Sequence, residues 1–260
     1  MASVKSNGAQ IFYEESGAGD ALILIPGLGA HSGIWGPFPK MFAERRRVIT
    51  YDPRGLGRSA GGTNKLSIGL MTSDAKAVLD AAGIQKAALL ATSMGALVAL
   101  RFALDYPART SKLVLITPAV FRTRYGEWLL DTLQLFRERF SPEEFVRAFV
   151  LLAFAPPFFE KGYGMIKEVS RMLTPTPAEY EQIGRQLECL KDADFSSEIS
   201  RIEAPTLIIA GQHDILAPIE GARKFASKIR RSRLVSIPDA GHSPFVEATE
   251  EVVKAIDEFL

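Results

Sequence analysis

The sequence has a single cysteine, Cys189, and only three histidines among its 260 residues. One cysteine excludes a disulfide bond within the chain and is typical of a reducing compartment. Three dispersed histidines and one cysteine do not form the ligand pattern of a metal site. The composition therefore predicts no metal, and the lack of a G-x-G-x-x-G or Gly-Lys-Ser/Thr motif predicts no nucleotide cofactor.

The sequence also lacks an excess of charge, because 31 basic and 30 acidic residues leave a net charge of +1. This balance gives no electrostatic reason to expect nucleic acid or an anionic membrane as a partner. No apolar run is long enough to span a bilayer. Residues 1–5 contain no apolar run, so we expect no signal peptide and a cytoplasmic location. A homodimer remains open.

What the sequence does contain is an alternation of short apolar runs with helical patterns, in a chain that is 47% hydrophobic. Alternating strands and helices imply an α/β fold, with a mostly parallel sheet flanked by helices. The expected strands are 9–15, 21–25, 48–51, 87–90, 112–117, 206–210 and 234–237. The expected helices are 34–42, 67–82, 93–106 and 245–260.

The alternation stops after residue 118 and resumes near residue 201, which predicts a helical cap inserted into the core. Capping-box patterns begin at Ser141 and Thr176, each with proline at the first helical position. We therefore assign residues 1–118 and 201–260 to the core and residues 119–200 to the cap.

Ser93 is the most informative residue, because it stands between the apolar run 87–90 and a helical stretch. A free serine hydroxyl is a poor nucleophile, and it becomes reactive on a sharp turn beside a base and backbone N–H groups. Such a turn requires small residues two positions before and after it, and these are Ala91 and Gly95. Taken alone, the segment could instead be a helix cap, since serine and threonine often occupy that position.

The segment Ala91-Thr92-Ser93-Met94-Gly95 resembles the nucleophile elbow of α/β-hydrolases, G-x-S-x-G, with alanine in place of the first glycine. This resemblance implies an acid after the strand 206–210 and a base on the loop after the last strand. Asp214 and His242 occupy these positions, in the chain order of the family. The family's alternative acid position, after the strand 112–117, holds no carboxylate.

Two further segments carry the resemblance. Residues 26–29, Pro-Gly-Leu-Gly, follow a buried strand where the family usually has His-Gly. The resemblance implies that the backbone N–H groups of Leu28 and Met94 hold an oxyanion. Residues 52–59 match the family signature D-x-R-G-x-G-x-S, in which Asp52 and Arg54 are expected to hold a loop by charge-assisted hydrogen bonds.

Aromatic residues are concentrated in the cap, since eight of the 16 phenylalanines lie in residues 121–159. A cap folded over Ser93 would give the site an apolar cover and exclude water. The residues that we expect to line a substrate pocket are His31, Phe121, Trp128 and Phe136.

The layout is similar to that of 3-oxoadipate enol-lactonases and small carboxylesterases. It implies a serine hydrolase for an apolar, small-molecule ester or lactone, without a cofactor. Two alternatives remain: a C–C bond hydrolase of ring-cleavage products, and a ligand receptor or signalling protein that retains the fold. The first is disfavoured, because such relatives usually have a tryptophan soon after the catalytic histidine, where this chain has Ser243-Pro244-Phe245.

Overall fold

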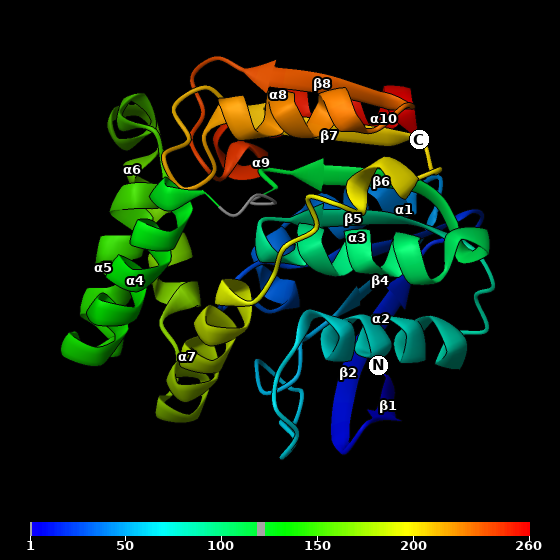
Figure 1. Ribbon diagram of the computed structural model, residues 1–260, viewed down its shortest axis with the longest axis horizontal. Helices are drawn as coiled ribbons and strands as arrows, with labels where there is room; N and C mark the ends of the chain where they lie inside the picture. The colour runs from blue at the N-terminus through cyan, green and yellow to red at the C-terminus, as the bar shows by residue number, and fades with distance from the viewer. Residues whose placement is uncertain (1, 119–122) are drawn as a thin grey trace.

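The computed structural model describes residues 2–118 and 123–260, which form an eight-stranded sheet with the order β1-β2-β4-β3-β5-β6-β7-β8 (Figure 1). The pairs β1–β2 and β2–β4 are antiparallel, and all other neighbouring strands are parallel. The strands are β1 (Ala2–Ser6), β2 (Ala9–Ser16), β3 (Ala21–Ile25), β4 (Arg47–Tyr51), β5 (Ala87–Thr92), β6 (Thr110–Ile116), β7 (Thr206–Gly211) and β8 (Ser232–Ile237).

Helices cover both faces of the sheet, as expected for parallel strands that are apolar on both sides. One face packs against α2 (Ile68–Ala81), α3 (Met94–Asp105) and α8 (Ile219–Lys228). The other packs against α1 (Phe38–Ala43), α9 (Pro244–Glu247) and α10 (Thr249–Phe259). The predicted fold class, a mostly parallel sheet flanked by helices, is confirmed.

Among the described residues, four α-helices lie between β6 and β7 in the chain, beside the carboxyl ends of the strands, and these four helices are called the cap below (Figure 1). Their apolar side chains form a third cluster, which also includes Leu216 from the loop after β7. Both expected capping boxes are present, at Ser141 and Thr176. The four helices are α4 (Arg124–Arg139), α5 (Pro142–Ala153), α6 (Pro156–Leu173) and α7 (Pro177–Lys191).

The structure differs from the predicted elements in three places. Strand β1 was not predicted; it pairs with β2 through a turn at Asn7 and Gly8, whose φ angles of 43° and 78° suit a tight hairpin. The expected helix 34–42 is a 3₁₀ turn (Ser32–Trp35) followed by α1, because Gly36 has a φ of 50° and Pro37 follows it. The terminal helix is divided into α9 and α10 at Ala248, which has non-helical angles.

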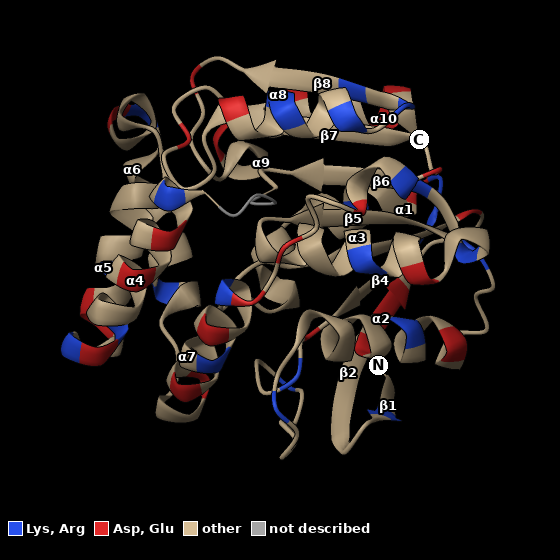
Figure 2. Ribbon diagram, in the orientation of Figure 1, with Lys and Arg blue, Asp and Glu red and all other residues tan. Residues whose placement is uncertain are grey.

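Charged residues of both signs are distributed over the outer surfaces of the helices (Figure 2). Within the part of the chain that the structure describes, no helix has the length and apolar character needed to cross a membrane.

One ion pair is an exception to this surface distribution, because Asp74 of α2 and Arg54 of the loop after β4 are both buried. Arg54 Nε and Nη2 each donate to a different carboxylate oxygen of Asp74, at 2.6 Å. This pair fixes the loop after β4, as expected for the signature in residues 52–59. Asp52 holds the same loop by accepting from the Ser32 and Arg58 N–H groups, both at 2.9 Å.

We predict that Asp74→Ala lowers the free energy of unfolding by about 3–5 kcal/mol, because it leaves the buried Arg54 charge without a partner. The control is Asp80→Ala on the same helix, whose partly exposed carboxylate pairs with Lys76 and Arg109. A surface pair of this kind contributes about 1 kcal/mol or less. Urea denaturation measures both values, and equal losses would contradict the assignment.

Candidate active site

Ser93 lies on the single-residue turn between β5 and α3, with φ 52° and ψ −120°. A non-glycine residue pays a strain cost in this region, and such strain persists only where the surroundings enforce it. The Ser93 N–H donates to the Ile116 carbonyl at 2.9 Å, which ties the turn to β6. At Gly95 a Cβ would stand 2.4 Å from the Ile25 carbonyl oxygen, so the turn has no room for a side chain there.

His242 lies on the loop after β8, and its imidazole reaches Ser93. The distance from His242 Nε2 to Ser93 Oγ is 2.8 Å, and the distance from His242 Nδ1 to Asp214 Oδ2 is also 2.8 Å. The structure therefore brings the three residues into one hydrogen-bonded chain, although 149 positions separate Ser93 from His242. Both His242 and Asp214 are buried.

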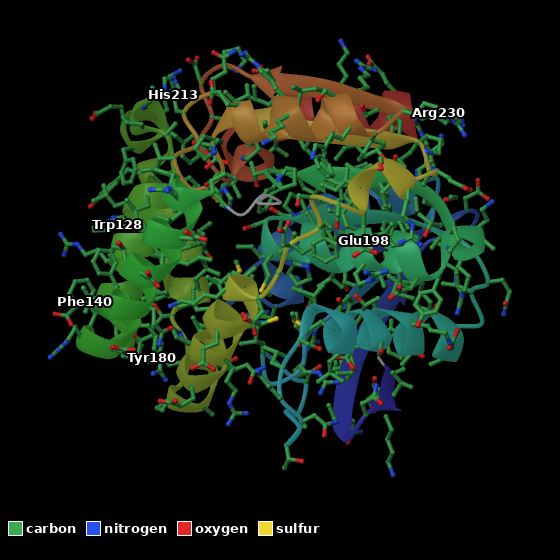
Figure 3. The ribbon with its side chains drawn as sticks, in the orientation of Figure 1. Trp128, Phe140, Tyr180, Glu198, His213 and Arg230 are labelled. Atoms are coloured by element: carbon green, nitrogen blue, oxygen red, sulfur yellow. The ribbon has the colours of Figure 1, made fainter. Side chains whose placement is uncertain are left out.

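Asp214 lies on the loop after β7, and its two oxygens have separate partners. Oδ2 faces the imidazole, while Oδ1 accepts from the Leu216 and Ala217 N–H groups at 2.9 and 2.8 Å. These backbone donors fix the carboxylate plane, so that the second oxygen stays aligned with His242 Nδ1. The neighbouring His213 is exposed and lies at the periphery of the molecule (Figure 3).

The loop that carries His242 is held by a partly buried carboxylate, that of Glu247 at the end of α9, a role that the sequence analysis did not identify. Glu247 Oε1 accepts from the N–H groups of Gly241 and Ser243, on either side of the histidine, at 2.9 and 3.2 Å. Glu247 Oε2 accepts from the Ala155 N–H at 2.8 Å, which links the loop to the cap. Burial raises the pKa of Glu247, against the opposing effect of these three donors.

Two more bonds hold the histidine loop. The His242 N–H donates to the Ala153 carbonyl at 2.7 Å, and the Thr117 hydroxyl donates to the His242 carbonyl at 3.1 Å. The position of the imidazole thus depends on the cap as well as on the sheet.

The loop after β3 lies on the other side of Ser93. Leu28 lines the pocket beside Ser93, and Met94 is the first residue of α3, where N–H groups have no partner inside the helix. The next N–H along the loop, that of Gly29, donates to Gln186 Oε1 of α7 at 2.8 Å. Sequence reasoning did not identify Gln186, because an isolated glutamine in an amphipathic helix gives no signal of such a contact.

A cavity of about 50 Å³ adjoins Ser93 and His242. Its walls are mostly apolar, and none of the described residues that line it is charged. Most of its apolar side chains come from the turn at Ile34, from α5, from α6 and from α9. They are Ile34, Phe149, Val150, Ala153, Phe154, Val169, Leu173, Phe245 and Val246.

The structure places three of the four residues predicted to line the pocket elsewhere, which corrects that expectation. His31 caps a 3₁₀ turn by accepting from Gly33 N–H at 3.1 Å, and it borders a separate open hollow. Trp128 is 75% exposed on the outer side of α4 (Figure 3). Phe136 stacks on Phe140, with ring centroids 4.9 Å apart. The fourth, Phe121, lies outside the described residues.

The physical reason for this difference is the orientation of the cap. Its helix α4, which carries Trp128 and Phe136, packs on α7 and α5, whereas α5 and α6 supply the pocket side chains. In residues 2–118 and 123–260, no three His, Cys, Asp or Glu side chains are grouped so that they could hold a metal ion.

Residues 20–249 match the family described as alpha/beta hydrolase fold, and the chain therefore belongs to this family. It is 28% identical over 245 residues to "Putative carbamate hydrolase RutD" of Azorhizobium caulinodans, covering 94% of this chain and 92% of the relative. It is also 28% identical over 257 residues to a pimeloyl-acyl-carrier protein methyl ester esterase of Nitrosomonas europaea, covering 96% and 99%.

Among solved structures, the enol-lactonase from Burkholderia xenovorans LB400 is similar with a TM-score of 0.90. The alignment covers 99% of both chains at 22% sequence identity, so this likeness shows the shared fold. The resemblance to α/β-hydrolases that the sequence indicated is confirmed.

We predict that Glu247→Ala lowers the free energy of unfolding by about 2 kcal/mol or more, because three partly buried N–H groups lose their acceptor. The matched control is Glu251→Ala, which removes an exposed acid from the first turn of α10 and should change stability by less than about 1 kcal/mol. Urea denaturation distinguishes the two variants. If Glu247→Ala is as stable as its control, the carboxylate does not hold the loop.

Proposed function

We propose that this protein is a serine hydrolase that cleaves a carboxylic ester or lactone through an acyl-enzyme. The observation that carries the proposal is the chain of two 2.8 Å contacts from Asp214 through His242 to Ser93, which ends at a strained turn. Serine on such a turn, a neutral imidazole and an orienting carboxylate are the parts that nucleophilic acyl transfer requires.

In the proposed reaction, Ser93 Oγ attacks the substrate carbonyl carbon while His242 Nε2 accepts the hydroxyl proton. The N–H groups of Leu28 and Met94 stabilise the negative oxygen of the tetrahedral intermediate. His242 then delivers the proton to the leaving oxygen, and water attacks the acyl-enzyme with the same imidazole as base. Asp214 orients the ring and stabilises the imidazolium that forms.

The size and apolar lining of the pocket favour a substrate with a small, uncharged acyl group. Its apolar walls provide no counter-charge, and moving an ionised group into such surroundings is costly. The named activities of the relatives, an esterase and a carbamate hydrolase, also concern carbonyl substrates that carry a heteroatom leaving group. An ester with a short aliphatic acyl chain fits both observations.

We predict that Ser93→Ala and His242→Ala each lower kcat by roughly 10⁶-fold, because members of such a triad act as a unit. Asp214→Asn should cost about 10⁴-fold, since the amide favours the wrong imidazole tautomer. The control is Asp192→Asn, an exposed acid at the end of α7, which should leave turnover unchanged.

Hydrolysis of p-nitrophenyl acetate measures these losses, and a fluorophosphonate should label Ser93. Labelling of another residue, or substantial turnover by Ser93→Ala, would refute the nucleophile assignment. A protein that is labelled at Ser93 but turns over only about once would instead support the receptor alternative.

A second prediction concerns acyl chain length. Each added methylene contributes about 0.8 kcal/mol of transfer free energy until the pocket is full. In the wild-type protein kcat/KM should therefore rise over the first few carbons of a p-nitrophenyl ester series and then fall. Phe149→Ala removes a wall of the pocket and should move the optimum to longer chains.

The matched control is Phe145→Ala, one helical turn earlier on α5. Phe145 is buried within the cap, with its ring 5.6 Å from that of Tyr180, and does not line the pocket beside Ser93. Its truncation should cost about 3–5 kcal/mol of stability and leave the chain-length optimum in place. An unchanged optimum in Phe149→Ala would show that α5 does not set the acyl preference.

A further inference from the structure

Helix α7 of the cap presents one face to the loops at the carboxyl edge of the sheet. Glu179, Gln182 and Gln186 recur at helical spacing on this face. Glu179 Oε1 accepts from the Gly57 N–H at 2.9 Å, and the Gln182 side chain packs against Gly55. Gln186 extends this row of contacts to the loop after β3, which lies beside Ser93.

Gln186 is completely buried, and only one of the two polar atoms of its side-chain amide has a hydrogen-bond partner among the described residues. Its Oε1 accepts from the Gly29 N–H at 2.8 Å, a contact between residues 157 positions apart. Its Nε2 has no hydrogen-bond partner in the described part of the chain. A buried donor without a partner destabilises the folded protein, and an apolar side chain of similar shape would avoid that cost. The contribution of this side chain to the fold is therefore its acceptor oxygen, which binds the Gly29 N–H.

The position of the Gly29 N–H bears directly on its neighbour Leu28. Each peptide unit is planar, so the chain between two anchored units has only the φ and ψ of the residue between them. The Gly27 carbonyl accepts from the Ala30 N–H at 3.3 Å, and the Gly29 N–H is held by Gln186. The first bond holds the peptide unit that contains the Leu28 N–H, and the second holds the following unit. Together they restrict the direction of the Leu28 N–H.

Among the described residues, the hydrogen bond that joins this loop to a side chain is the one from the Gly29 N–H to Gln186. Pro26 has no N–H and no polar side chain, so it cannot donate a hydrogen bond from within the segment. The hydrogen bond that holds this loop therefore comes from the cap, through the Oε1 atom of Gln186.

We propose that Gln186 is a positioning residue for the oxyanion site: its side chain fixes the loop 27–30 so that the Leu28 N–H faces the developing negative oxygen. This inference rests on the proposed function. It adds that a cap helix, and not only the core, contributes to stabilisation of the tetrahedral intermediate.

The test replaces Gln186 with methionine, which keeps the shape, removes the acceptor and leaves no buried amide nitrogen. In Gln186→Met, kcat for p-nitrophenyl acetate should fall about tenfold or more, towards the roughly 10²–10³-fold loss that removal of an oxyanion donor causes. KM should change less than about twofold, because ground-state binding does not use the oxyanion contact.

The matched control is Gln182→Met, one helical turn earlier on the same helix. Gln182 is also buried, but it packs on Gly55 and not on the loop beside Ser93. The variant Gln182→Met should keep kcat within about twofold of the wild-type value, since it leaves the bond from Gly29 to Gln186 in place and so does not change the contact of the Leu28 N–H with the transition state. Thermal unfolding of both variants shows whether they are equally folded, and Gln186→Leu replaces Gln186→Met if the latter does not fold.

A second readout is independent of the natural substrate. A trifluoromethyl ketone forms a tetrahedral adduct with the nucleophile, and its inhibition constant should rise in Gln186→Met by about the same factor as kcat falls. The inhibition constant of Gln182→Met should stay close to that of the wild-type protein.

Equal kinetics and equal inhibition constants in the two variants would overturn the positioning role, while Ser93 labelling and wild-type turnover would still support the hydrolase. A rise in KM without a fall in kcat would also overturn it. Absence of labelling at Ser93 in the wild-type protein would refute the proposed function itself.

Discussion

The close approach of four loops at the carboxyl edge of the sheet is the constraint on which the site depends. A Cβ at Gly95 would stand 2.4 Å from the Ile25 carbonyl oxygen, and a Cβ at Gly211 would nearly coincide with the Gly241 carbonyl. The turn after β5 therefore packs against the end of β3 with no room for a side chain at Gly95, and the end of β7 packs in the same way against the loop after β8 at Gly211. Parallel strands end at the same edge, so their loops meet there, and glycine allows contact close enough for 2.8 Å hydrogen bonds between them.

The cap takes part in this arrangement. It accepts the His242 N–H through the Ala153 carbonyl, reaches Glu247 through the Ala155 N–H, and holds the Gly29 N–H through Gln186. These bonds involve backbone groups whose burial without a partner would be costly. The histidine loop and the loop after β3 are therefore both bonded to the same group of helices. Displacement of these helices would move the His242 imidazole and the proposed oxyanion site together.

The sequence was sufficient for those features that depend on local pattern. Strand positions follow from short apolar runs, and the turn at Ser93 follows from small residues at positions 91 and 95. The loops of Asp214 and His242 follow from their places after two strands, once the likeness to a known family is recognised. The missed strand β1 was also within reach, since Asn7-Gly8 is the strongest short signal of a hairpin.

Contacts between distant elements were not predictable in this way. Gln186 meets Gly29 across 157 positions, and Glu247 meets Ala155 across 92. Neither residue type is unusual for an amphipathic helix, so its partner depends on how the cap docks. The same uncertainty misdirected the choice of pocket residues. Aromatic rings are frequent in α4, but Phe136 stacks on its helical neighbour Phe140, and Trp128 faces solvent.

Different helices of the cap contact the pocket beside Ser93 and the loop after β3. The small pocket beside Ser93 is bounded by Phe149 of α5 and Leu173 of α6, and the same two side chains border a second apolar void of about 20 Å³. Their size therefore limits the space for an acyl chain. The contact that orients the loop beside Ser93 comes from α7 instead. Because different helices carry the two roles, substitutions in α5 and α6 can change the acyl group that fits while the bond from Gln186 to Gly29 stays intact. In the proposed reaction, reactivity and substrate size are thus separable in this cap, although both depend on the same docking of its helices against the sheet.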